Sequence, residues 1–253
     1  MRVALKFAYD GISYAGYAQQ PTVLTVEEDI LTLLIKNSLI DSKKESWLQT
    51  ASRTDKGVSA LGNVLAFNTS NFSIADLEQF DDDSKNIFIY GFSVVPSDFY
   101  PRYAKQRVYR YYLEKRSFTV DDLISVLALF TGENNFSNFA RIEGFKNPIR
   151  TIDNIFLSEI DDFFIIDFYA QNYLWQQIRR IISAIEKVGK GKITIKQVSK
   201  ALSDSHTKVD FGVADANALL LKDVLYGFDF KYHKDFKKSL HDLEKNIVNR
   251  LKV

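Results

Sequence analysis

Residues 152–170, which read IDNIFLSEIDDFFIIDFYA, predict a β-hairpin and with it an antiparallel sheet. Two apolar runs, Ile152–Ile160 and Phe163–Ala170, lie on either side of the polar pair Asp161-Asp162. Strand-forming runs joined by a short polar turn are typical of a hairpin. A parallel pair would instead need a long crossover between its strands, and the chain has no room for one here.

Similar patterns extend outward from this hairpin in both directions. The large apolar side chains of Val3, Leu5, Phe7 and Tyr9 alternate with Ala4, Lys6 and Ala8, which is the period of a half-buried strand. A helix is expected from Thr25, because Thr25 and Glu28 have the spacing of a capping box. Apolar patterns predict further strands at about 64–67, 86–95, 107–113 and 218–230, and further helices at about 120–132, 174–188, 195–202 and 234–251.

This order of elements predicts an α+β protein built from two similar α/β halves. We expect residues 1–104 and residues 105–253 to form these halves. They would share one mostly antiparallel mixed sheet with helices on one face. No low-complexity linker separates them, so a central active-site cleft is expected where they join, near Pro101 to Tyr109.

The composition is that of a globular chain and excludes several kinds of chemistry. Of the 253 residues 46% are hydrophobic, and 33 Lys and Arg nearly balance 32 Asp and Glu, which leaves a net charge of +1. The absence of cysteine rules out disulfides, thiol catalysis and thiolate metal sites. The three histidines are not spaced as a metal cluster. We therefore expect no metal site built from cysteine or histidine, and a chemistry of carboxylates, phenols, hydroxyls, lysines and arginines.

The hydropathy pattern argues against a membrane protein. The most apolar stretch, residues 123–132, has about half of the ~20 residues that a spanning helix needs. The first residues alternate in polarity and lack the apolar core of a secretory signal. We expect a cytoplasmic protein with no membrane partner.

The loop Ser52-Arg53-Thr54-Asp55-Lys56-Gly57-Val58 is the most informative segment for function. Asp55 lies between two basic residues, and a positive charge within about 4–6 Å favours the ionised form of a carboxyl group. Gly57 permits the positive φ of a tight turn. Two interpretations stay open, which are a catalytic carboxylate and an Asx turn in which Asp55 only caps its own backbone.

A second segment, from Asp98 to Tyr111, interleaves basic residues with tyrosines. In a strand, Arg107, Tyr109 and Tyr111 share one face. Cations that meet phosphates, beside phenol rings that stack on bases, suit RNA. The alternative is a strand whose long side chains cover its solvent face.

A third segment, Asn172–Ile181, places Arg179 at the edge of an apolar helix face, on one ridge with Trp175 and Ile182. An unpaired guanidinium is costly to desolvate, so Arg179 needs a partner, and a carboxylate such as Asp55 would serve. The alternative is that its stem packs and its head reaches water.

Taken in this order, the segments resemble the tRNA pseudouridine synthase A family, TruA, over most of the chain. Tyr9-Asp10-Gly11 through Gln19-Gln20 resembles the family's opening motif, and Ser52–Ala60 resembles its catalytic loop. The sequence departs from the family pattern at Tyr17, Ser52 and Ser59, where Trp, Gly and His are usual. The further matching segments are Phe99–Tyr111, Asn134–Phe139, Pro148–Ile152 and Leu174–Ile181.

The resemblance implies isomerisation of uridine to pseudouridine in the anticodon stem-loop of tRNA, at tRNA positions 38 to 40. Asp55 would be the catalytic aspartate, and Arg179 would form an ion pair with it. Tyr109 would stack on the flipped uracil, and a further role of its hydroxyl as a base stays open. A homodimer that one tRNA spans is implied, with neither metal nor cofactor. The residues expected to bind the RNA are Arg53, Thr54, Arg102, Arg107, Arg110 and Tyr111.

Other functions are compatible with parts of this pattern. A non-catalytic RNA-binding protein of the same fold would use the tyrosines and arginines alone, and a related synthase would act at other RNA positions. A glycoside hydrolase would need two cooperating carboxylates. No second acidic residue occurs in the local motifs around Asp55, Tyr109 or Arg179.

Overall fold

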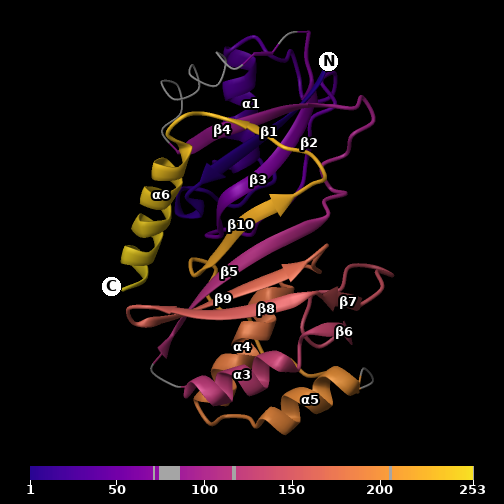
Figure 1. The fold of residues 1–253 in the computed structure, drawn as a ribbon. Coiled ribbons are helices and arrows are strands. Elements are labelled where there is room, and N and C mark those ends of the chain that lie inside the picture. Colours follow the sequence, from indigo (N-terminus) through magenta and orange to yellow (C-terminus); the bar gives the residue numbers. More distant parts are fainter. Residues whose placement is uncertain (71, 74–85, 116–117, 205–206, 253) are drawn as a thin grey trace. The chain divides into compact units, whose positions relative to one another are not determined.

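The computed structural model describes residues 1–70, 72–73, 86–115, 118–204 and 207–252, and its ribbon is shown in Figure 1. The chain divides into two compact units, Met1–Lys105 with Leu220–Val253 (unit 1) and Gln106–Leu219 (unit 2). The predicted α+β class is confirmed, because each unit combines helices with mostly antiparallel strands. Residues 220–253, which the sequence analysis assigns to the C-terminal half, pack in unit 1.

The sheet of unit 1 is built around β1 (Arg2–Tyr9), all of whose residues are buried. β1 pairs antiparallel with β3 (Ser59–Asn68) on one side and with β4 (Ile87–Val95) on the other. The alternation in β1 predicts a half-buried strand, with one face exposed to solvent. That prediction is wrong, because both faces of β1 are buried. The strand is central in the sheet, and its second face carries Ala4 and Ala8 together with the buried side chains of Arg2 and Lys6, of which Lys6 forms an ion pair with Asp223.

Three shorter strands complete the sheet of unit 1. β10 (Leu219–Leu225) runs parallel to β3, with Leu220 opposite Ser59, so the sheet is mixed. β11 (Lys231–Tyr232) pairs with β4, and β2 (Gln49–Thr50) pairs with β3. The long strand expected at 218–230 therefore ends at Leu225.

Two helices pack on this sheet, α1 (Val26–Lys36) against β4 and α6 (Phe236–Leu251) against β3. Thr25 caps α1 as predicted, since its hydroxyl accepts a hydrogen bond from the Glu28 N–H at 3.3 Å. The second bond of the predicted capping box, from the Thr25 N–H to the Glu28 side chain, is wrong. The Glu28 carboxylate instead accepts a hydrogen bond from the Gln19 side chain. A short 3-10 turn, η1 (Gly11–Ser13), follows β1.

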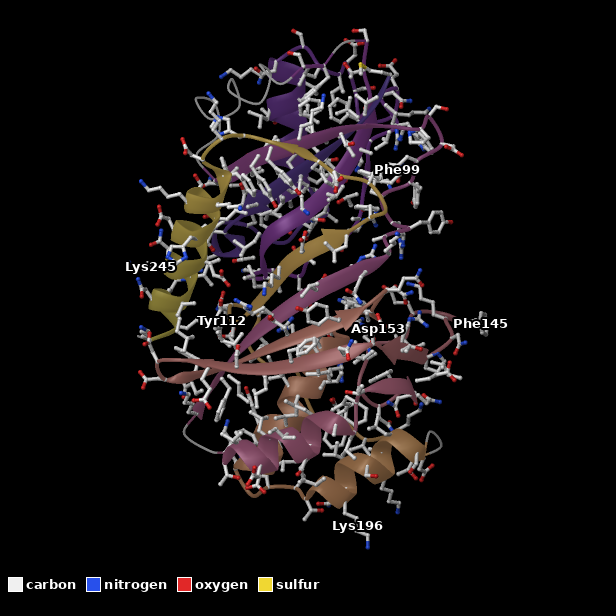
Figure 2. All side chains as sticks on the ribbon, in the orientation of Figure 1. Phe99, Tyr112, Phe145, Asp153, Lys196 and Lys245 are labelled. Carbon is white, nitrogen blue, oxygen red and sulfur yellow. The ribbon has the colours of Figure 1, made fainter. Side chains whose placement is uncertain are left out.

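Unit 2 contains the predicted hairpin, with β8 (Asn154–Ile160) and β9 (Phe163–Ala170) joined through Asp161 at φ +46°. β9 also pairs antiparallel with β5 (Gln106–Glu114), so the strand order is β5-β9-β8. A second, small sheet of β6 (Gly132–Asn135) and β7 (Ile149–Ile152) was not expected from the sequence. The β6–β7 connection carries Phe145, whose side chain points away from the unit (Figure 2).

The helices of unit 2, α3 (Val120–Ala128), α4 (Gln177–Gly189) and α5 (Ile195–Ser203), lie together on one side of its sheet (Figure 1). α3 ends before the expected Gly132, whose φ of +86° leads into β6. α4 begins three residues later than expected, because Gln176 has a left-handed φ of +59°. Within the described ranges, no helix has the length and apolar character that crossing a bilayer requires.

A buried ion pair links β1 to β10 inside unit 1. The Nζ atom of Lys6 lies 2.6 Å from Oδ1 of Asp223, and the two side chains are 6% and 34% exposed. An ammonium group removed from water needs such a partner, because its desolvation is otherwise uncompensated.

This pair predicts an asymmetry between two substitutions. Asp223→Asn leaves the buried ammonium without a counter-charge and is expected to lower the free energy of unfolding by about 2–4 kcal/mol. Lys6→Met removes the buried charge itself and leaves Asp223 partly in water, so it should cost about 1 kcal/mol or less. Urea unfolding followed by circular dichroism measures both. Equal losses for the two variants would contradict this account of the pair.

Candidate active site

The loop Ser52–Val58 joins β2 to β3 in unit 1 and carries Asp55, which is half-buried. The backbone carbonyl of Asp55 accepts a hydrogen bond from the Val58 N–H at 3.1 Å, and Gly57 has a φ of +85°. That φ is the reason glycine is needed at this position. A backbone hydrogen bond therefore closes the turn around Asp55.

The start of the loop is anchored to β3. The Ala51 N–H donates to the Val64 carbonyl at 2.8 Å, and the side-chain amide of Asn63 donates to the Ser52 carbonyl at 2.9 Å. Asn63 is fully buried and Ser52 is nearly so. These bonds hold the chain on the approach to Asp55 in one path.

The opening segment of the chain supports the middle of the loop. The hydroxyls of Tyr9 and Thr54 share a buried hydrogen bond of 2.8 Å, and the Tyr17 N–H donates to the Thr54 carbonyl at 3.0 Å. Thr54 is 8% exposed, so its side chain, which we expected to bind RNA, faces the interior of unit 1. Tyr17 is buried as well, and this burial raises the pKa of its phenol.

The same segment also touches the end of the loop, at Gly11. A Cβ on Gly11 would lie 2.3 Å from the carbonyl oxygen of Val58, which is a backbone atom that cannot rotate away. The Gly11 N–H donates to the Ser59 hydroxyl at 3.0 Å. The motif Tyr9-Asp10-Gly11 and the Asp55 loop are therefore in direct contact, although about 45 residues separate Tyr9 from Thr54.

Three basic side chains of unit 1, two of them beside Asp55 in the loop, are exposed to solvent. Arg53 and Lys56, its neighbours in the loop, are exposed, and so is Arg102 in the segment before β5. Exposed guanidinium and ammonium groups are the usual contacts of proteins with phosphates. The loop thus presents one carboxylate between cations that an RNA backbone could reach.

In unit 2, the two arginines of β5 are engaged by the protein. Arg107 is buried and donates to the Gln171 carbonyl. Arg110 binds the carboxylate of Asp167, opposite it on β9, with two bonds of 2.8 and 2.7 Å. Both were expected to bind RNA, and both have partners that fix them within the sheet.

The two tyrosines of β5 differ in exposure. Tyr109 is partly exposed, and its ring meets the edge of the Tyr173 ring with centroids 5.3 Å apart and planes at 89°. Tyr111 is 2% exposed, and burial raises the pKa of its phenol, which therefore stays neutral. Of the two, Tyr109 is the ring that unit 2 presents for stacking.

Arg179, in the first turns of α4, is held by a reciprocal pair of bonds. Its Nε donates to the Ala214 carbonyl at 2.9 Å, and the Ala214 N–H donates to the Arg179 carbonyl at 3.0 Å. Its positive charge lowers the pKa of the Tyr111 phenol, whereas burial, the larger effect, raises that pKa. The structure thus fixes the stem of Arg179 within unit 2.

The predicted residues are divided between the units. Asp55, Arg53, Thr54 and Arg102 lie in unit 1, and Tyr109, Tyr111, Arg107, Arg110 and Arg179 lie in unit 2. Sequence reasoning missed Tyr9 and Tyr173 as supports of Thr54 and Tyr109. Each of them stands inside a segment quoted above, Tyr9 in the opening motif and Tyr173 in Asn172–Ile181, and this position was the available signal.

The Tyr9–Thr54 bond leads to a testable prediction. Tyr9→Phe and Thr54→Val each leave a buried hydroxyl without this partner, so each should cost about 1–2 kcal/mol of stability. The double variant removes both hydroxyls, so its loss of stability should be clearly smaller than the sum of the losses in the two single variants. Thermal unfolding of the four proteins in this double-mutant cycle gives the coupling. Strict additivity would show that the bond contributes nothing to the loop.

Comparison with known proteins identifies the family of this chain. A family model described as tRNA pseudouridine synthase matches residues 126–227. The protein named tRNA pseudouridine synthase A from Thermococcus sibiricus is 40% identical over 211 residues, which are 83% of this chain and 78% of that protein. Its namesake from Pyrococcus horikoshii is 37% identical over 255 residues, which cover 99% of this chain and 95% of the relative. The resemblance predicted from the motifs is confirmed, and the chain belongs to the tRNA pseudouridine synthase A family.

Proposed function

We propose that this protein is a tRNA pseudouridine synthase, an isomerase that converts uridine in tRNA to pseudouridine. The observation that carries the proposal is the Asp55 loop of a chain in this family, braced by the opening motif at Thr54 and Val58. Most of the binding and catalytic groups that the chemistry needs are at or near the surface of one unit or the other.

The reaction is an isomerisation, so its atoms and electrons balance within the substrate. The bond between N1 of uracil and C1′ of ribose breaks, the uracil turns, and a bond from C5 to C1′ replaces it. The proton on C5 is lost to solvent, and N1 gains a proton in its place. We propose that ionised Asp55 either attacks C1′ or removes the proton from C2′. Arg53 and Lys56, exposed beside it, would hold the phosphates of the nucleotide so that the base is extruded from its stack.

Unit 2 would supply the other two catalytic side chains. We propose that the Tyr109 ring stacks on the extruded uracil, with Tyr173 fixing its orientation from the edge. We also propose that the guanidinium of Arg179 pairs with Asp55 and keeps it ionised. The bond from Arg179 Nε to Ala214 supports this role, because it restricts the side chain before any substrate arrives.

The partners follow from the same assignment. We propose the anticodon stem-loop as the substrate region, a homodimer as the active form and the cytoplasm as the compartment. Arg102 and Arg53 are exposed and suited to the RNA backbone. Arg107, Arg110 and Tyr111 would contribute by shaping β5, since each is buried or bonded within unit 2.

Replacement of the carboxylate tests the proposed activity. Asp55→Asn is expected to lose at least about a thousandfold in turnover, because an amide is neither a nucleophile nor a base here. Its affinity for tRNA should stay within about threefold of that of the unmodified protein. Tritium release from uridine-labelled tRNA measures turnover, and filter binding measures affinity.

The matched control is Asp242→Asn, which makes the same change on the exposed side of α6 and should leave turnover unchanged. Substantial turnover by Asp55→Asn would remove Asp55 from the catalytic role. Binding of tRNA without any pseudouridine formed by the unmodified protein would favour the non-catalytic RNA-binding protein. Site-resolved mapping of pseudouridine in total tRNA separates the anticodon stem-loop from other positions.

The stacking role of Tyr109 is tested by two substitutions that both remove its hydroxyl. Tyr109→Phe keeps the ring and Tyr109→Leu does not, so leucine should weaken the productive complex by a further ~1–3 kcal/mol, the usual contribution of one base stacked on an aromatic ring. The ratio of kcat/KM for the two variants measures this difference. Equal kcat/KM values far below that of the unmodified protein would assign the role of Tyr109 to its hydroxyl, and equal values close to it would remove Tyr109 from the reaction.

A further inference from the structure

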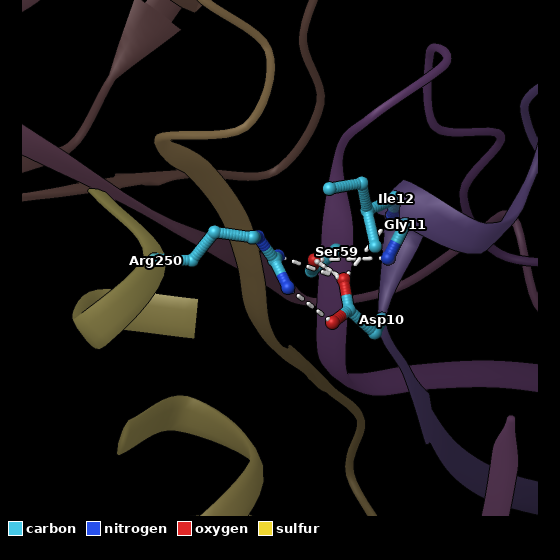
Figure 3. A network of polar contacts seen from close by, with 5 residues as sticks. All are labelled: Asp10, Gly11, Ile12, Ser59 and Arg250. Carbon is cyan, nitrogen blue, oxygen red and sulfur yellow. Dashed lines mark hydrogen bonds and ion pairs between the residues drawn. The ribbon is translucent and has the colours of Figure 1, made fainter. Parts of the chain in front are cut away.

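An ion pair joins the opening motif to the far end of the chain (Figure 3). Nη1 of Arg250 lies 2.7 Å from Oδ2 of Asp10, and Nη2 of Arg250 lies 2.9 Å from Oδ1 of Asp10. The two side chains are 30% and 23% exposed. A bidentate, partly buried arginine–carboxylate pair fixes orientation as well as distance, which a surface lysine would not do.

Asp10 passes this constraint to the backbone that follows it. Its Oδ1 accepts a hydrogen bond from the Ile12 N–H at 3.1 Å, which caps η1, and another from the Ser59 hydroxyl at 3.4 Å. The Ser59 hydroxyl in turn accepts the Gly11 N–H at 3.0 Å. Ser59 is one of the departures from the family pattern, and here it ties the end of the Asp55 loop to Asp10.

The path from Arg250 to the Asp55 turn is short and made of close contacts. Gly11 lies directly against the carbonyl of Val58, with no space for a side chain between them. Val58 closes the turn on the Asp55 carbonyl. A displacement of Asp10 and η1 therefore moves the backbone of the Asp55 turn, because two backbones in contact cannot shift independently.

Other parts of α6 show that this helix has separate means of attachment. Ile247 and Val248 are buried, so they anchor the helix by apolar packing. Lys237, Lys238 and Lys245 are exposed, and Lys245 extends away from the helix in Figure 2. Arg250 therefore differs from these lysines in its burial and in its carboxylate partner.

We propose that Arg250 is a positioning residue for the reaction, which sets the place of the Asp55 carboxylate through Asp10, Ser59 and Gly11. This inference rests on the proposed function of Asp55. Arg250 touches neither substrate nor reacting atoms in this role. Its effect should appear in kcat, because a misplacement of about 1 Å at a catalytic group can cost about a hundredfold in rate.

The kinetic test compares two substitutions of Arg250. Arg250→Ala is expected to lower kcat about tenfold or more, with KM for tRNA within about twofold of that of the unmodified enzyme. Arg250→Lys keeps the charge but cannot bind both carboxylate oxygens. Its kcat should therefore lie between that of Arg250→Ala and that of the unmodified enzyme. Asp10→Asn should lower kcat in the same way. The double variant Asp10→Asn, Arg250→Ala should be no slower than the worse single variant, because both act through one contact.

Two control variants separate positioning from simple attachment of the helix. Lys245→Ala removes a positive charge from the same helix and should leave kcat unchanged. Val248→Ala loosens the apolar anchor of α6 without touching Asp10, so it should lower the melting temperature and leave kcat of the folded enzyme within about twofold. An unchanged kcat in Arg250→Ala, or an equal fall in Val248→Ala, would overturn the proposal.

A second measurement does not depend on catalysis. Amide hydrogen exchange of the peptide that covers residues 52–59 should be faster in Arg250→Ala than in Val248→Ala or in the unmodified protein. Unchanged exchange in this peptide would overturn the inference even if the protein proves to be a synthase. Faster exchange in a protein that forms no pseudouridine would support the link to the loop while the proposed function itself fails.

Discussion

The contact between two backbones, at Gly11 and at Val58, is the constraint on which the candidate site depends. At this point the chain that leaves β1 lies against the chain that enters β3, at a distance that excludes even a methyl group. Thr54 is held by the same segment through its carbonyl and its hydroxyl. The Asp55 loop is therefore shaped by its surroundings and not only by its own turn, which gives a polar surface loop the rigidity that a catalytic group needs.

The sequence predicts best where one local rule acts alone. The hairpin 152–170 has a two-residue turn between strand-forming runs, and both strands form with Asp161 at the turn. The cap at Thr25 likewise depends on neighbours within one helical turn. Where tertiary contacts compete, boundaries shift. Gln176 adopts a left-handed conformation that delays α4, and the polar strands β6 and β7 carry no apolar alternation that would reveal them.

The candidate site shows the same division between local and distant information. The motif around Asp55 predicts this residue and the need for a glycine at Gly57. It does not predict that the Thr54 side chain points into unit 1 and bonds to Tyr9. The strand pattern of β5 indicates its basic and aromatic residues. It does not predict that Arg110 is bound by Asp167, because Asp167 lies on another strand. The pairing of Asp10 with Arg250 spans 240 residues and has no local signature at all. Contacts of this kind follow from the fold and not from a motif.

Unit 1 is built from two stretches of chain that lie far apart in the sequence, and this has a consequence for biosynthesis. Residues 106–219 form unit 2 as one continuous stretch, whereas β10, β11 and α6 leave the ribosome only after it. Until they arrive, β3 and β4 keep edges that these strands later cover, and open strand edges invite pairing with other chains. The nascent protein thus holds the Asp55 loop in an unfinished scaffold after all of residues 106–219 have been synthesised.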